Sequence, residues 1–166
     1  MNDSPEEWAG EVAVRRVTFD GRTLAEDRQD LTIAARSTAT VTIPADVWTC
    51  ADEASELLVV DFAGSRAFWF YAEYRDSALQ AARVTTSVRQ TDGATEVTVT
   101  AENLVRDLTL LVDKIDPAAV VDDQMVTLLP GESVTFRITS PTPLDPDALV
   151  SPSVLRTANQ LVADWG

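Results

Sequence analysis

Short segments with alternating apolar and polar residues make up much of this chain. Residues 97–101 and 134–138 place apolar side chains at every second position, and residues 84–88 place Val84, Thr86 and Val88 on one face. Such a period predicts strands with one buried face. No window longer than about eight residues keeps the apolar spacing of an amphipathic helix. The pattern therefore predicts an all-β protein.

Turn signals separate the predicted strands. Asp-Gly pairs favour two-residue hairpins, in which both central residues need a positive φ. A Pro-Gly pair favours a turn because proline presets φ and glycine accepts the left-handed conformation. Four reversals are predicted in this way, and they imply antiparallel pairing: Asp20-Gly21, Ala63-Gly64-Ser65, Asp92-Gly93 and Leu129-Pro130-Gly131-Glu132.

Three local irregularities are also predicted. In residues 11–19 the apolar positions change parity, which a one-residue bulge near Arg15-Arg16 would explain. Residues 145–149 begin with an N-cap acid and a proline at the first helical position, which predicts a short helix. Residues 44–48 predict a second one. Both helices would connect strands.

A weak internal repeat divides the chain. The two strand–Asp-Gly–strand segments stand 72 residues apart, and each is followed by further short strands. Strands separated by turns every ~8–12 residues are typical of sandwiches. We predict two tandem immunoglobulin-like antiparallel β-sandwiches, in residues 1–76 and 77–166, the first of which lacks its first strand.

Charge and cysteine content limit the partners and the compartment. The formal net charge of −14 disfavours binding to nucleic acid or to an anionic membrane. The single cysteine, Cys50, excludes an internal disulfide, and no apolar run is long enough to span a bilayer. We expect a cytoplasmic protein, unless a signal peptide lies in a missing N-terminal part.

Candidate chemistry is sparse. The chain has no histidine, so the usual general base and the commonest metal ligand are missing. Neighbouring acids on a strand point to opposite faces and rarely form a paired catalytic site. Pairs such as Asp122-Asp123 are therefore expected in turns, and a calcium site is the alternative at this pair. Cys50 has no partner and predicts a structural thiol. Asn2-Asp3-Ser4 is a weak glycosylation triplet. We predict no catalytic residue, no metal site and no cofactor.

The densest cluster of aromatics lies in residues 66–74. We expect Phe68 and Phe70 to fill a core and Trp69 and Tyr71 to point away from it. Together with Tyr74, the outward rings predict either a sugar-stacking platform or a buried contact with another domain, and the second is favoured. Trp8 and Trp165, near the two ends, are expected to be similarly exposed.

Five segments, in order along nearly the whole chain, match a known pattern: Asn2-Asp3, Phe19-Asp20-Gly21-Arg22-Thr23-Leu24, the alternating 39–43, the aromatic strand with Arg75-Asp76 and Leu79, and Leu128-Leu129-Pro130-Gly131-Glu132 followed by Val134-Thr135-Phe136. These segments resemble the two C-terminal sandwich domains of β-mannosidases in glycoside hydrolase family 2. The chain departs from the family at Val121-Asp122-Asp123-Gln124-Met125, and it lacks the proline pair of the family's linker near 72–74.

This resemblance implies a role without chemistry of its own. In that family, two glutamates on a (β/α)₈ barrel carry out catalysis, and no position here matches either of them. The implied function is a non-catalytic accessory region that packs against the barrel of a parent hydrolase or forms a contact in a homo-oligomer. The alternatives are a free-standing carbohydrate-binding module that uses Trp69 and Tyr71, and a cell-surface immunoglobulin-like module.

Overall fold

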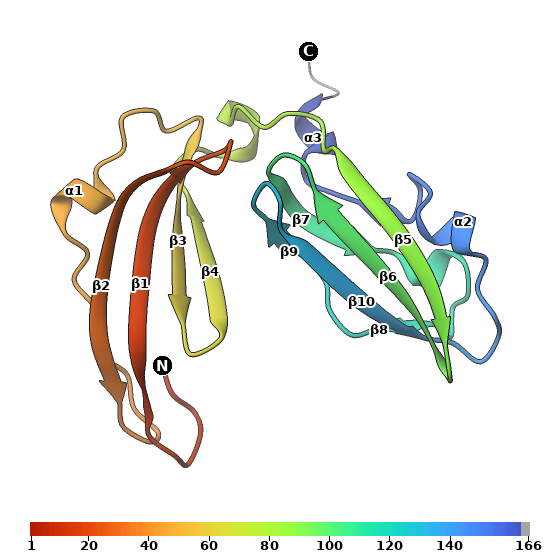
Figure 1. Cartoon of the computed structure of the whole chain (residues 1–166), viewed down its shortest axis with the longest axis horizontal. Coiled ribbons are helices and arrows are strands. Elements are labelled where there is room, and N and C mark those ends of the chain that lie inside the picture. Colours follow the sequence, from red (N-terminus) through yellow and green to blue (C-terminus); the bar gives the residue numbers. More distant parts are fainter. Residues whose placement is uncertain (164–166) are drawn as a thin grey trace. The chain divides into compact units, whose positions relative to one another are not determined.

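The computed structural model describes residues 1–163, which form two compact units divided between Asp76 and Ser77 (Figure 1). Trp165 lies outside the described residues. None of the helices in the described part of the chain is long and apolar enough to cross a membrane. The prediction of an all-β protein built from antiparallel sheets is confirmed.

The first unit is built on one four-stranded antiparallel sheet with the order β2-β1-β3-β4 (Figure 1). A short helix, α1, lies between β2 and β3, as residues 44–48 predicted, and a 3-10 helix, η1, follows β4. The elements are β1 (Trp8–Thr18), β2 (Thr23–Ile33), α1 (Ala45–Trp48), β3 (Glu56–Phe62), β4 (Ser65–Phe70) and η1 (Tyr74–Asp76).

One face of this sheet is covered by the segment that contains α1. Val12, Val14 and Leu58 form a buried cluster with Val47 of α1. Residues 39–43 resembled a strand by their alternation, but they form none. They nevertheless place Val41 and Ile43 against this cluster. A segment without strand pairing therefore covers this face.

The parity change in β1 has a different cause from the predicted bulge. The ladder between β1 and β3 runs without a shift from Val12 to Thr18. The ladder between β1 and β2 does shift at Arg16/Val17, where Arg16 pairs with Ala25 and Val17 pairs with Thr23. The extra residue therefore lies on β2, not on β1. Parity changes because both faces of the strand are buried, with Val14 on one and Val17 on the other.

The N-terminal residues are fixed to the end of β2. Asn2 is fully buried and pairs with Ser37 in an isolated bridge. Its side-chain amide donates to the carbonyls of Glu6, at 2.7 Å, and Ile33, at 3.1 Å. An amide used in this way is closed to glycosylation, so the Asn2-Asp3-Ser4 triplet has a structural role.

The second unit is a sandwich of two sheets. One sheet has the order β5-β6-β10-β8 and the other the order β11-β7-β9 (Figure 1). Its helix α2 begins as predicted, with Asp145 accepting from the amide of Asp147. The elements are β5 (Val84–Thr91), β6 (Ala94–Ala101), β7 (Val105–Leu110), η2 (Val112–Lys114), β8 (Val120–Val121), β9 (Val126–Leu128), β10 (Ser133–Thr139), α2 (Pro146–Leu149), β11 (Leu155–Arg156) and α3 (Gln160–Ala163).

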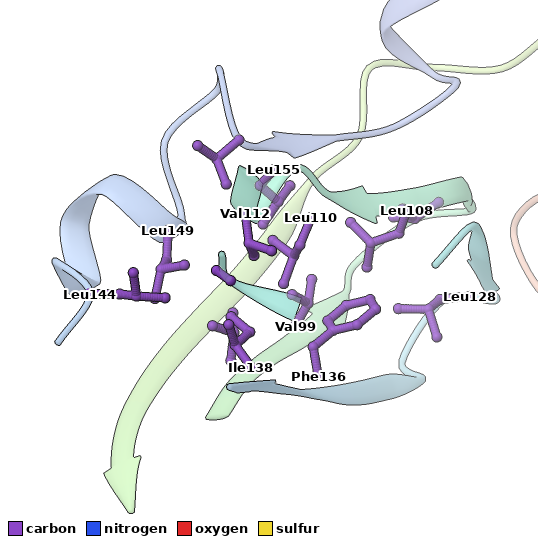
Figure 2. Close-up of a cluster of buried hydrophobic side chains, with 14 of the residues drawn as sticks. Val99, Leu108, Leu110, Val112, Leu128, Phe136, Ile138, Leu144, Leu149 and Leu155 are labelled. Carbon is purple, nitrogen blue, oxygen red and sulfur yellow. The ribbon is translucent and has the colours of Figure 1, made fainter. Parts of the chain in front are cut away.

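The core of this unit is contributed by strands of both sheets and by α2. Phe136 of β10 is fully buried and lies near Val99 and Leu128 in Figure 2. Leu110 of β7 and Leu149 of α2 belong to the same cluster. Buried and exposed side chains alternate along β6 and β10, as the sequence predicted, because the outer faces of these strands carry threonine and charged residues.

Glycine provides the left-handed residue at each predicted turn. Gly21, Gly64, Gly93 and Gly131 all have a positive φ. Neither aspartate of the two Asp-Gly pairs shares it, so the expectation of two positive φ angles in those turns was wrong; Ala63-Gly64 is the pair that has them. The Pro-Gly turn is further fixed by the Glu132 carboxylate, which accepts from the Leu129 amide at 2.9 Å.

Asn159 ties three segments of the second unit together. It is fully buried, donates to the carbonyls of Gln80 and Leu104, both at 2.8 Å, and accepts from the amide of Arg106 at 2.9 Å. Its replacement leaves buried backbone groups without partners, each costing ~1–3 kcal/mol. We expect Asn159→Ala to lower the free energy of unfolding by about 3 kcal/mol in urea titrations. A loss no larger than that of an exposed substitution, such as Leu161→Ala, would contradict this role.

Candidate functional site

Two exposed tryptophans and a half-buried tyrosine from two segments form a cluster on the first unit. The ring of Trp48, at the end of α1, lies 6.2 Å from the ring of Trp69 in β4, with an angle of 41° between the planes. It lies 5.8 Å from the ring of Tyr71, at 60°. Trp69 is 56% exposed and Trp48 46% exposed. We call Trp48, Trp69 and Tyr71 the aromatic patch.

The strand that carries Trp69 orients its rings differently from the prediction. Trp69 pairs with Leu58, and Tyr71 packs against the buried cluster under α1. Phe68 and Phe70 lie on the other face and are half-buried; Phe70 contacts Phe19 edge-on at 6.1 Å. The expectation that only the phenylalanines face a core was therefore wrong for Tyr71.

The remaining predicted residues lie elsewhere. Tyr74 belongs to η1, past the end of β4, and is half-buried. Trp8 is 39% exposed at the start of β1, where it pairs with Ile33. Trp48 was not assigned to the site, because it is distant from Trp69 in the sequence and only the path of the covering segment brings it near.

A buried ion pair fixes the helix that carries Trp48. Arg16 contacts Glu56 at 2.5 Å, and the side chains are only 13% and 6% exposed. Arg16 also donates to the carbonyls of Val47, at 3.2 Å, and Asp46, at 3.4 Å. The Tyr71 hydroxyl donates to the carbonyl of Trp48 at 2.7 Å. The patch is thus held in place from beneath although its two tryptophan rings are exposed.

Burial raises the pKa of Tyr71 to about 12. A raised pKa favours the neutral phenol in the folded state. The contribution of the Tyr71 phenol to folding stability is therefore complete below the unfolded pKa of 10.0 and is lost as the pH rises towards 12. We expect Tyr71→Phe to remove a phenolate step near pH 12 from an ultraviolet titration. Persistence of that step in the variant would contradict this placement.

Acidic and sulfur groups outside the patch take structural roles. Asp122 accepts from the amide of Arg137, and Asp123 accepts from the amide of Gln124. Within residues 1–163 no group of three or more acids and cysteines is placed to hold a metal ion. Burial, followed by Glu53 and Glu56, raises the pKa of the Cys50 thiol, which makes it a poor nucleophile.

The second unit carries a shallow pocket of about 240 Å³ near the β5–β6 turn. Its lining includes Gln90, Thr95 and Ser140 and no charged side chain. Gln90 accepts from the Thr95 hydroxyl, and Asp116 holds the loop at Ser140 by accepting from its hydroxyl. These polar groups are therefore already paired within the protein.

Comparison with known families identifies the second unit. Residues 79–160 match the model of the mannosidase Ig-fold domain (Ig_mannosidase). The second unit is therefore similar to a mannosidase Ig-fold domain. This match and the sandwich of the second unit agree with the resemblance to family 2 glycoside hydrolases read from the sequence, which is confirmed. No curated protein sequence matches the chain.

Two solved structures extend the likeness to both units of the chain. The β-D-mannosidase of Dictyoglomus thermophilum matches 92% of this chain with a TM-score of 0.69 and 20% identity, over 18% of its own length. The exo-chitosanase of Amycolatopsis orientalis matches 84% with a TM-score of 0.50 and 18% identity, over 22% of its own length. The chain thus has the fold of a part of larger glycoside hydrolases and spans about a fifth of their length.

Proposed function

We propose that this chain is a non-catalytic accessory region of a β-mannosidase-like glycoside hydrolase. The observation that carries the proposal is the match of residues 79–160 to the mannosidase Ig-fold domain. In this proposal the chain packs against a catalytic (β/α)₈ barrel and supports it, while the barrel supplies both catalytic carboxylates.

The surroundings of two carboxylates, Glu56 and Asp61, support a non-catalytic role for the chain. Glu56 is buried against Arg16, and Asp61 is held between Arg15, at 3.0 Å, and Arg66, at 2.6 Å. Burial raises the pKa of Asp61, but the hydrogen bonds and charges of Arg66 and Arg15 together outweigh this effect and hold the pKa below its ordinary value. A general acid for glycoside cleavage needs the opposite shift, which keeps its proton near neutral pH.

An activity assay on the purified chain and on the native protein tests the proposal. We expect the purified chain to leave an aryl β-mannoside and an aryl β-glucosaminide uncleaved. Material precipitated from a lysate of the source organism, with an antibody raised against the chain, should cleave one of the two. Turnover by the purified chain, or a precipitate without glycosidase activity, would overturn the proposal.

A further inference from the structure

The aromatic patch combines exposure with rigidity. Trp48 and Trp69 contact each other, and both are about half exposed. The backbone of Trp48 is fixed by the Tyr71 hydroxyl, and the neighbouring carbonyl of Val47 is fixed by Arg16. Rings that are held in place before binding lose little entropy when a ligand covers them. Such an arrangement suits a binding site.

The size of the patch favours a small partner. A tryptophan side chain buries about 150–250 Å² when fully covered, so two half-exposed rings offer roughly 200 Å². A stable protein interface needs about 800 Å² from each partner. The surroundings add little apolar area, because Asp46 and Thr49 beside Trp48 are polar and exposed. The patch therefore fits one or two sugar rings better than a protein.

The charge around the patch defines the ligand further. Residues 37–65, which contain Trp48 and β3, the strand paired with that of Trp69, include five acids and no base. Two of these acids, Glu56 and Asp61, are paired with arginines. Asp46, Asp52 and Glu53 form no ion pair among residues 1–163. With a net charge of −14 for the chain, a positively charged ligand is attracted and an anionic one repelled.

We propose that the aromatic patch binds oligosaccharides with protonated amino groups, such as β-linked glucosamine. The C–H face of a pyranose ring stacks on Trp69, and Trp48 closes one side at its 41° tilt. The ammonium group is attracted both by the ring faces and by the carboxylates of the base-free segment. This proposal does not depend on the proposed accessory function.

Titration calorimetry of the whole chain with a glucosamine hexamer, at a pH where its amines are protonated, tests the proposal. We expect saturable binding that weakens with salt and falls about tenfold or more in Trp69→Ala. Trp8→Ala is the matched control, because it removes another exposed tryptophan from the same unit, and it should bind normally. Circular dichroism checks that both variants are folded.

Neutral and basic comparison ligands identify the chemistry. We expect an N-acetylated hexamer and a mannohexaose to bind about tenfold more weakly than the glucosamine hexamer. Equal binding of the neutral sugars would overturn the cationic specificity. Binding of a lysine hexamer as tightly as the glucosamine hexamer would show that charge attraction alone accounts for the affinity, and it would overturn the proposal. An unaltered affinity for the glucosamine hexamer in Trp69→Ala would show that the aromatic patch is not the binding site.

Discussion

Glu56→Ala is expected to lower the free energy of unfolding by about 3–5 kcal/mol. The Glu56 and Arg16 side chains are almost completely buried and in contact at 2.5 Å. Removal of the carboxylate leaves the guanidinium of Arg16 buried without its counter-charge. Since Arg16 also bonds the carbonyls of Val47 and Asp46, the loss should extend to α1. Urea titration followed by tryptophan fluorescence measures it, because Trp8, Trp48 and Trp69 all lie in the first unit.

An exposed pair in the same sheet serves as the control. Glu11 and Arg28 are paired across β1 and β2 with about half of each side chain exposed. Because solvent screens such pairs, Glu11→Ala should cost less than about 1 kcal/mol. The double substitution Arg16→Met and Glu56→Leu removes both charges and should restore much of the stability. Equal losses in Glu56→Ala and Glu11→Ala would show that the buried pair does not stabilise the unit.

Phe136→Ala is expected to cost about 3–5 kcal/mol in the second unit. Phe136 is fully buried between the two sheets, and its removal leaves a cavity beside Val99 and Leu128 (Figure 2). Thr139→Ala, an exposed change at the end of the same strand, should stay within about 0.5 kcal/mol. Urea titration by far-ultraviolet circular dichroism compares the two. A loss for Phe136→Ala as small as that for Thr139→Ala would contradict a shared core between the sheets.

Much of the fold could be predicted because its determinants are local. The alternation of β6 and β10 shows which side chains are buried, since one face of each strand is polar. The glycines mark the turns because they accept a positive φ, and Asp145-Pro146 marks the start of α2 because each residue suits its capping position. These signals need no knowledge of the neighbouring strand.

The predictions were wrong where the conformation of a strand depends on a neighbouring segment. Leu57, Leu58 and Val59 of β3 are all buried, so a period of two cannot assign a face to the paired β4. The face of Tyr71 was therefore misjudged. The register shift depends on an extra residue in β2, which the pattern of β1 cannot show.

The candidate site was predicted only in part, for a related reason. Trp69 and Tyr71 were identified because aromatic residues crowd one strand. Trp48 could not be identified, because it joins them only through the path of the segment that covers the sheet. The ion pair beneath it links Arg16 to Glu56, forty residues apart, and no local pattern connects them.

The size of the native protein tests the central claim most directly. An antibody raised against this chain should detect, in a denaturing immunoblot of the source organism's lysate, a band several times heavier than 18.0 kDa. That result is predicted if the chain is the accessory region of a larger glycoside hydrolase. A band at 18.0 kDa would contradict the account and make the chain an independent module.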